Sequence, residues 1–313
     1  MEMNHSATAD VEFILVGLSQ DRGYQNFIFW TFTFIYTMAL VGNFLLILAI
    51  GTCRKLHTPM YFLLVNLSVV NVCSISVTVP KILQMVLDQK RTISFSGCIT
   101  QVFLFVWALG TEILLLSFMA FDRYAAICQP LHYTDIMRKE ICIGVAAGVW
   151  LVGLANSAVH AGLLMTLSFC DSEIINHFFC DLPPLWKLSC SNISLNEAMA
   201  FAADVTFTMS SCTLTLISYL LILRTILKIQ SVTGKKKAFS TCSSHLLVVS
   251  FYFSTIIYTY AKPHSTNDEE EYKTIAIIYS VVTPVLNPIV YSLRNKEVKE
   301  ALTKFICRHQ SFQ

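Results

Sequence analysis

Long apolar segments separated by short polar stretches dominate the pattern of the chain. Seven of these segments are long enough to cross roughly 30 Å of hydrocarbon as helices. They are Phe27–Ile50, Pro59–Val79, Cys98–Ala120, Ile141–Met165, Ala198–Leu223, Ala238–Tyr260 and Thr274–Leu293. The pattern therefore predicts an all-α membrane protein with a seven-transmembrane helix bundle at 27–293, an N-terminal segment at 1–26 and a tail at 294–313.

Composition and charge support this prediction and give it an orientation. Hydrophobic residues make up 55% of the chain and charged residues only 13%, against roughly a quarter charged in soluble domains. Of the 22 Lys and Arg residues, fifteen fall on the side of the tail and seven on the other. Because basic loops stay in the cytoplasm, we expect the N-terminus outside, where Asn4 of Asn4-His5-Ser6 is a glycosylation acceptor.

The eleven cysteines divide by compartment under this topology. Cys98, Cys170, Cys180 and Cys190 are predicted outside, where disulfides form, and spacing alone allows three pairings. Cys307 lies beside basic residues near the membrane and is a candidate for acylation. We expect the remaining cysteines to stay reduced and to behave as small buried apolar residues.

A specific motif stands where the third segment leaves the membrane. Residues 119–133 read MAFDRYAAICQPLHY and include Asp122, Arg123 and Tyr124. Further ordered matches are Glu12–Leu15, Gly42-Asn43, Leu56–Phe62, Ser218-Tyr219, Lys237–Cys242 and Pro284–Asn295. Together they give the chain a close resemblance to the olfactory receptors, a family of rhodopsin-like G-protein-coupled receptors.

The resemblance implies a function and a set of site residues. It implies a plasma-membrane receptor of olfactory cilia that binds a small volatile odorant and activates the olfactory stimulatory G protein, raising cyclic AMP. It implies the disulfides Cys98–Cys180 and Cys170–Cys190. The residues that it assigns to coupling and activation are Asp122, Arg123, Tyr124, Tyr219, Asn287, Pro288 and Tyr291.

Several of these positions also have a direct physical reading. Pro288 lacks an amide hydrogen, so the seventh helix should kink there, with Asn287 supplying a partner to the freed backbone. Arg123 can pair with Asp122 and later donate to Tyr219 and Tyr291, although the pair alone could equally be an interfacial anchor. The basic loop 224–237 suits anionic lipid as well as a G protein. Residues 295–308 have the pattern of an amphipathic helix along the membrane.

Helical phase locates a ligand cavity in the outer half of the bundle. Counting back from Arg123 places Glu112 on an inward face of the third helix, because ionisable side chains avoid lipid. We expect a small, mostly apolar ligand, although each wall residue could equally be ordinary helix packing. The predicted ligand-binding residues are Val102, Phe105, Val106, Leu109, Asp204, Phe207, Phe253, Ile256, Tyr260, Ile277 and Ser280.

Glu112 and Asp204 are the acidic residues inside the predicted spans. Related receptors hold sodium near Glu112, but Asn71 stands here where the family usually has Asp, which removes one carboxylate. Asp204 could contact a ligand or could be a satisfied structural carboxyl; we favour the second, and with it neutral ligands, because an unpaired buried charge is costly. The family commonly has Phe-Tyr-Gly where this chain has Tyr252-Phe253-Ser254.

Other function classes fit the sequence less well. A transporter would show internal repeats and interrupted spans, and an intramembrane enzyme would show a metal-ligand or nucleophile motif. His177 to Asp181 could suggest a metal site, but the resemblance assigns Cys180 to a disulfide. We therefore expect a receptor that is not an enzyme and has no cofactor, no resident metal and no nucleic-acid partner.

Overall fold

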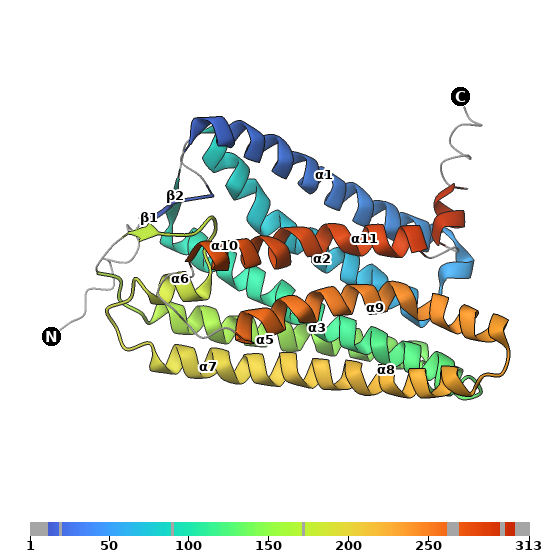
Figure 1. Ribbon diagram of the computed structural model, residues 1–313. Coiled ribbons are helices and arrows are strands. Elements are labelled where there is room, and N and C mark those ends of the chain that lie inside the picture. The colour runs from blue at the N-terminus through green and yellow to red at the C-terminus, as the bar shows by residue number, and fades with distance from the viewer. Residues whose placement is uncertain are drawn as a thin grey trace, which may run out of the picture.

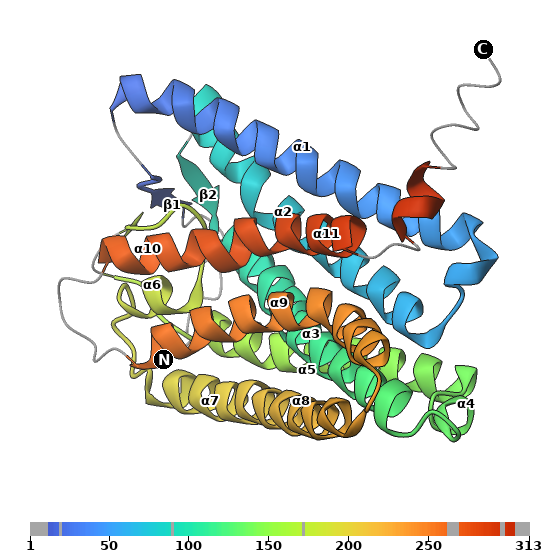
Figure 2. The same cartoon turned by 45° about the vertical axis from the view of Figure 1, so that its right-hand side comes forward.

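The computed structural model describes residues 12–18, 21–88, 91–170, 173–261, 269–294 and 298–303. Long helices run side by side along one axis, with α1 and the α7–α8 pair on opposite sides of the bundle (Figures 1 and 2). The long helices are α1 (Arg22–Thr52), α2 (Pro59–Leu87), α3 (Phe95–Cys128), α5 (Lys139–Met165), α7 (Ser194–Asp204) with α8 (Ser210–Lys228), α9 (Val232–Ala261) and α10 (Glu269–Ile277) with α11 (Thr283–Arg294).

Six helical stretches in the described residues are long and apolar enough to span a membrane. They are Gly23–Thr52, Pro59–Leu87, Phe95–Cys128, Lys139–Met165, Ser194–Lys228 and Glu270–Ser292. Each contains or largely overlaps a predicted span, so the chain is a multi-pass, mostly helical membrane protein. The predicted span Ala238–Tyr260 lies in α9, whose first turns are polar and basic; that this helix also crosses the membrane stays a prediction.

The outward surface of the bundle is apolar, as lipid requires. On α1 the side chains of Phe27, Trp30 and Phe34 are between 66% and 70% exposed. On α8 the side chains of Leu216 and Leu220 are similarly open. Polar side chains such as Asn71 and Glu112 are instead fully buried. This inversion is expected where hydrocarbon, rather than water, surrounds the helices.

Two of the long stretches contain a single π-helical turn. Val205–Met209 joins α7 to α8, and Ile278–Val282 joins α10 to α11. In a π turn the backbone bonds reach five residues instead of four, so one extra residue is accommodated. Side chains before and after each turn are therefore rotated relative to a regular α-helix.

A small sheet covers the outer end, which the sequence pattern did not predict. The strand β1 (Glu12–Leu15) lies between β2 (Thr92–Ser94), antiparallel, and β3 (Ile174–Ile175), parallel. Two disulfides, Cys98–Cys180 and Cys170–Cys190, tie the same region together. These are the pairs that the resemblance implies. The segment before the first span is thus fixed onto the loops that follow α2 and α5.

The opposite end carries short elements. The turn η1 (Arg54–Leu56) follows α1, and α4 (Tyr133–Ile136) follows α3. Residues 298–303 are helical, with Val298 and Ala301 buried against the core and Lys299 exposed. This part has the predicted amphipathic pattern; the rest of 295–308, including Cys307, lies outside the described residues.

The contact of α3 with α5 depends on a glycine. A Cβ atom at Gly153 would lie 2.6 Å from Thr111 Oγ1 and 3.3 Å from the carbonyl oxygen of Trp107. Thr111 Oγ1 itself donates to that carbonyl at 2.7 Å, so the hydroxyl cannot simply move away. A Cβ atom at Gly148, one and a half turns earlier in α5, meets nothing within 4 Å.

We therefore expect Gly153→Ala to destabilise the protein although alanine favours helices by up to about 1 kcal/mol over glycine. Overpacking of this kind typically costs about 1–3 kcal/mol. Gly148→Ala is the matched control and should be neutral or stabilising. Thermal unfolding of the purified protein measures both, and equal midpoints for the two variants would contradict the close approach.

Candidate functional site

The helix α3 carries the predicted inward face through the centre of the bundle. Phe105, Glu112, Leu116 and Met119 are all at most 2% exposed. The face begins near Cys98, which joins the outer loop through its disulfide, and ends at Asp122 near the other end. Phase counting was therefore correct for α3, which is a regular α-helix throughout its length.

An aromatic cluster lies in the outer half of the bundle, around the predicted ligand residue Phe105. The ring of Phe105 lies edge-on to Phe179 of the outer loop, with centroids 5.0 Å apart. It also contacts Tyr279 of the seventh helical stretch, with centroids 5.7 Å apart. Three segments far apart in the chain thus meet at Phe105. The sequence identified Phe105 but not its two aromatic partners.

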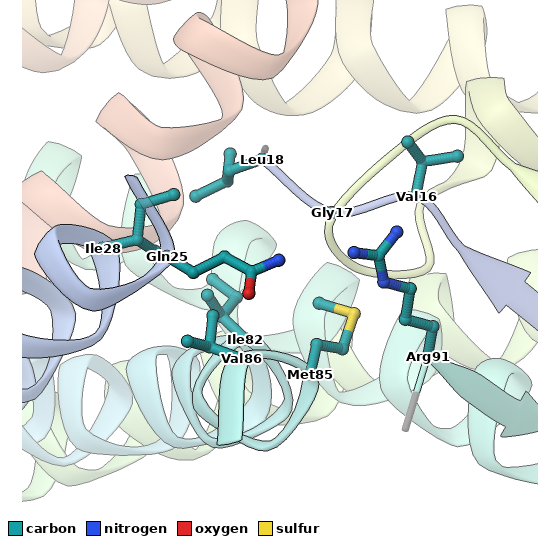
Figure 3. A pocket seen from close by; sticks show the side chains of 9 residues that line it. All are labelled: Val16, Gly17, Leu18, Gln25, Ile28, Ile82, Met85, Val86 and Arg91. Atoms are coloured by element: carbon teal, nitrogen blue, oxygen red, sulfur yellow. The ribbon is translucent and has the colours of Figure 1, made fainter. Parts of the chain in front are cut away.

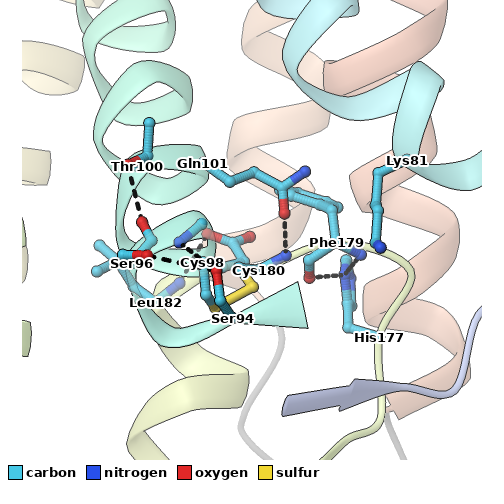
Figure 4. Close-up of a disulfide and its surroundings, with 12 residues drawn as sticks. Lys81, Ser94, Ser96, Cys98, Thr100, Gln101, His177, Phe179, Cys180 and Leu182 are labelled. Carbon is cyan, nitrogen blue, oxygen red and sulfur yellow. Dashed lines mark hydrogen bonds between the residues drawn. A yellow bond between two sulfur atoms is a disulfide. The ribbon is translucent and has the colours of Figure 1, made fainter. Parts of the chain in front are cut away.

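The outer loop is held over this cluster by covalent and polar links to α3 (Figure 4). The Cys98–Cys180 disulfide brings the two Cα atoms to 5.4 Å. The amide of Cys180 donates to Gln101 Oε1 at 2.9 Å, and Gln101 Nε2 donates to the carbonyl of Val77 on α2 at 2.8 Å. One buried glutamine therefore fixes the loop to two helices, and no sequence pattern predicted it.

Asp181 links the same loop to the seventh helical stretch. Its Oδ2 accepts from the hydroxyl of Tyr272 at 2.7 Å and from that of Tyr279 at 3.0 Å. Its Oδ1 accepts from the amide of Leu182 at 2.8 Å, which caps α6 (Leu182–Trp186). The carboxyl is only 6% exposed, so these donors replace water.

His177 lies beside this link. Its ring stacks on Phe178, with centroids 4.4 Å apart, and approaches Tyr272. Burial lowers the pKa of His177 below its usual value, because the charged imidazolium loses hydration there; Asp181 acts in the opposite direction. The described residues contain no group of three or more His, Cys, Asp or Glu side chains able to hold a metal.

The other predicted ligand residues divide between two packed clusters. Val102, Val106 and Ile277 pack with Phe105 in the outer cluster, whereas Phe207 and Phe253 pack in the inner one. Leu109 contacts both. Ser280 is buried, and its hydroxyl donates to the carbonyl of Ala276 within the helix. The side chains of Asp204, Ile256 and Tyr260 lie outside the described part of the structure, as does Asn4.

Two of the predictions by helical phase were counted across π turns. Counting whole turns from Tyr291 selected Ser280 and Ile277, but the turn at Ile278–Val282 adds a residue. Ile277 packs in the outer cluster and Ser280 is buried, but the count did not select Tyr279, which contacts Phe105 and bonds Asp181. The position of Asp204 was likewise counted from Tyr219 across Val205–Met209, so the inward direction inferred for Asp204 has no support from a regular helix.

A chain of buried amides crosses the middle of the bundle. Asn43 Nδ2 donates to the carbonyl of Pro284 at 3.0 Å, and Asn71 Nδ2 donates to Asn43 Oδ1 at 3.4 Å. Asn287 Nδ2 lies 3.2 Å from both Asn71 Oδ1 and Glu112 Oε1. Glu112 thus has an amide donor in place of a second carboxylate. Sodium at Glu112 and Asn71, which the missing carboxylate disfavours, is not tested by this arrangement.

The prediction that Asn287 compensates for Pro288 was wrong in its choice of residue. An amide at position 288 would bond the carbonyl four residues back, which belongs to Pro284. That carbonyl receives Asn43 instead. Gly42 makes the approach possible, since a Cβ atom there would lie 3.1 Å from the ring of Pro288.

At the inner end, the carboxylate of Asp122 interacts with two side chains, those of Arg123 and Tyr133. Arg123 Nε lies 3.9 Å from Asp122 Oδ2, and the hydroxyl of Tyr133 donates to Asp122 Oδ1 at 2.8 Å. Burial and the adjacent carboxylate raise the pKa of Tyr133, which therefore stays a neutral donor. The sequence identified the Asp122–Arg123 pair but not Tyr133. Tyr124 lies nearby and accepts a hydrogen bond from Gln129.

Tyr219 and Tyr291, the tyrosines predicted to accept hydrogen bonds from Arg123, do not do so in this structure. The hydroxyl of Tyr219 lies 2.7 Å from His245 Nδ1, and His245 Nε2 lies 3.0 Å from the carbonyl of Leu116. His245 therefore bridges α8 and α3 from α9. The hydroxyl of Tyr291 is buried without a hydrogen-bond partner among the described residues. Arg123 is thus linked to Asp122 in this conformation, and not to Tyr219.

Comparisons with known proteins give one consistent answer. A family model described as olfactory receptor matches residues 32–309. The chain is 46% identical to human olfactory receptor 13G1 over 96% of the chain and 98% of that protein. It is 47% identical to mouse olfactory receptor 5AP2 over 97% and 96%, and 44% identical to human olfactory receptor 13A1 over 96% and 92%.

We expect Tyr279→Phe to loosen the outer loop, because Asp181 then loses one of its two phenolic donors. Hydrogen bonds to charged groups contribute about 1.5–3 kcal/mol. Tyr36→Phe is the control: Tyr36 bonds the neutral hydroxyl of Ser76 at 3.2 Å and should matter less. Hydrogen exchange of residues 177–182, with thermal unfolding, measures the difference. Unchanged exchange in Tyr279→Phe would contradict the proposed anchoring.

Proposed function

The chain belongs to the olfactory receptor family, and from this premise we propose that it is an odorant receptor that couples to a heterotrimeric G protein of the olfactory stimulatory type. Binding of a small organic molecule in the outer half of the bundle raises cyclic AMP in this proposal. The observation that carries it is the match to olfactory receptors over nearly the whole chain. The described geometry supports a site at each end of α3.

We propose that the ligand is neutral and mostly apolar. The outer cluster around Phe105 consists of aromatic and aliphatic side chains, with the hydroxyl of Tyr279 already engaged by Asp181. A ligand that reaches Phe105 must therefore gain most of its affinity from apolar contact. Asp204 is not required for such ligands, and an ammonium group has no described carboxylate free to receive it at Phe105.

We propose that coupling takes place at the other end, around Asp122, Arg123 and Tyr124. The side chain of Arg123 is largely buried and forms an ion pair with Asp122. This is the pairing expected in a resting conformation. Release of Arg123 would let its guanidinium donate to Tyr219, Tyr291 or the G protein. The hydroxyl of Tyr219 would then form a hydrogen bond with Arg123 instead of His245. The basic stretch 224–237, which is mostly helical because it spans the end of α8 and the start of α9, would add attraction to acidic groups of the partner and to anionic lipid.

The proposed location is the plasma membrane of olfactory cilia, with the N-terminus outside. The distribution of basic residues supports the orientation. The two disulfides at the end that carries β1 also support it, since disulfides persist in the extracellular space. Glycosylation of Asn4 and acylation of Cys307 belong to the same proposal. The transporter and enzyme alternatives are not favoured, because the relatives are named as receptors.

Arg123→Ala should abolish ligand-dependent nucleotide exchange on the G protein while cell-surface expression is retained, because the guanidinium is the proposed contact. Arg138→Ala is the control, since Arg138 is an exposed cation at the same end of the bundle. A panel of odorants with a cyclic AMP readout identifies an agonist first. Full signalling by Arg123→Ala would contradict the coupling proposal. Failure to find any agonist in a broad panel would contradict the ligand proposal.

Phe105→Ala should raise the concentration of a neutral agonist needed for half-maximal response by about tenfold or more, since a buried aromatic ring contributes about 1.5–3 kcal/mol of contact. Phe34→Ala is the control, because Phe34 faces outward from α1. Alcohols, ketones and esters of similar shape should be affected alike, and amines should be poor agonists. Equal shifts in Phe105→Ala and Phe34→Ala would refute a specific contact.

A further inference from the structure

The outer loop contains a buried histidine whose hydrogen bonding is incomplete. The side chain of His177 is 1% exposed. Its Nδ1 lies 3.1 Å from the carbonyl oxygen of Phe179 and 3.4 Å from the amide nitrogen of the same residue. Its Nε2 is buried without a hydrogen-bond partner among the described residues. Whichever nitrogen carries the proton of the neutral ring, Nε2 is therefore a polar atom left unpaired.

Aromatic rings enclose this imidazole. The ring of Phe178 stacks on it with centroids 4.4 Å apart, and Phe179 meets it edge-on at 4.8 Å. Tyr272 of α10 is tilted against it at 5.5 Å. Phe179 is also the ring that contacts Phe105 of α3. The position of His177 is therefore tied to the position of the loop over Phe105.

The backbone of His177 also holds the N-terminal segment. The amide of Gly17 donates to the carbonyl of His177 at 3.2 Å, and the amide of Val16 donates to that of Ile175 at 3.0 Å. Gly17 has φ +78°, a left-handed conformation that glycine adopts without strain. Val16 and Gly17 line a small pocket together with Met85 of α2 (Figure 3). The N-terminal segment, the outer loop and α10 thus meet at His177.

The charged groups around His177 do not compensate a positive ring. Asp181 attracts an imidazolium, but its carboxylate already accepts hydrogen bonds from two tyrosine hydroxyls and one amide. Lys273 of α10 repels it and is itself paired with Glu270 at 2.7 Å. Lys81 of α2 is a further cation in this region (Figure 4). Burial has the largest effect and lowers the pKa of His177.

The direction of a pH effect follows from this lowered pKa. An imidazole in water has a pKa of about 6.5. When the loop opens, His177 therefore takes up a proton that it does not bind in the closed loop. Below about pH 6.5 the closed loop loses stability relative to the open one, by up to about tenfold in the equilibrium constant per pH unit. Above this pH the ring is neutral in both states and the closed loop keeps its full stability.

We propose that His177 is a proton-operated latch, whose protonation at mildly acidic pH releases residues 175–179 from Phe105 and from the N-terminal segment at Gly17. The neutral ring fits the aromatic enclosure, whereas the imidazolium gains hydration only when the loop opens. The Cys98–Cys180 disulfide keeps the loop attached to α3, so the opening is local and reversible. The proposal concerns the loop itself and does not depend on odorant binding or on G-protein coupling.

The test is hydrogen exchange of the purified full-length protein in nanodiscs of uncharged phosphatidylcholine, at pH 7.5 and pH 5.5. After correction for the intrinsic pH dependence of exchange, protection of residues 173–182 should fall by about tenfold at pH 5.5, as expected for an imidazole that titrates only in the open loop. A peptide from α5 should keep its protection. Unchanged protection of residues 173–182, or an equal loss in both peptides, would overturn the proposal.

Variants identify the titrating group. His177→Asn keeps a polar atom near Phe179 and His177→Phe keeps a ring, but neither side chain titrates, so the pH dependence should vanish in both. Thermal unfolding identifies a variant that fails to fold, and the other then decides; if neither folds, the wild-type profile decides. His57→Asn, which changes an exposed histidine of the inner end, is the matched control and should behave as wild type.

Asp181→Asn separates the two titratable groups of the loop. If His177 is the latch, this variant should keep the pH dependence. Loss of the pH dependence in Asp181→Asn would assign the titration to the carboxylate instead, and its persistence in a folded His177 variant would exclude the imidazole. Either result would overturn the proposal.

Discussion

The satisfaction of buried polar groups is the constraint on which this bundle depends. Inside the membrane there is no water to replace a missing partner, so every break in a helix needs a donor from elsewhere. Pro288 leaves the carbonyl of Pro284 without its helical amide, and Asn43 supplies the donor. Gly42, the adjacent residue, lets the ring of Pro288 come close enough for this to happen. Two neighbouring residues of α1 thus make a proline tolerable in α11.

The same constraint extends across the bundle to Glu112. Asn287 of α11 donates to Glu112 of α3 and to Asn71 of α2, and Asn71 donates in turn to Asn43 of α1. Four helices therefore share one polar chain, and none of its members can be replaced by an apolar residue without leaving a buried group unpaired. Losses of that kind cost about 1–3 kcal/mol each. The tight link explains why the predicted inward face of α3 and the observed one agree at Glu112.

Sequence periodicity predicted the spans because hydrophobic length and phase are local properties. It was reliable on α3, a regular helix, and it did not select Tyr279, which lies in a π turn; the inward direction of Asp204, counted across another π turn, stays a prediction. The contacts of the outer loop were beyond its reach. Gln101 bonds a residue 79 positions away, and Asp181 bonds Tyr272 and Tyr279 across 91 and 98 positions. No periodic signal marks such pairs, nor the strand at Glu12–Leu15.

The two proposed ends of signalling differ in how well their polar groups are paired. At the outer end, Asp181 has three donors and holds Tyr279 beside Phe105. At the inner end, Arg123 Nε and the hydroxyl of Tyr291 lack hydrogen-bond partners among the described residues. A ligand shifts a conformational equilibrium only through interactions that differ between the two states. A ligand that displaces Tyr279 weakens a well-paired site, and a conformation that brings Arg123 to Tyr291 pairs groups that are now unpaired. Loss at the outer end can therefore be offset by gain at the inner end, which is the energetic condition for coupling the two.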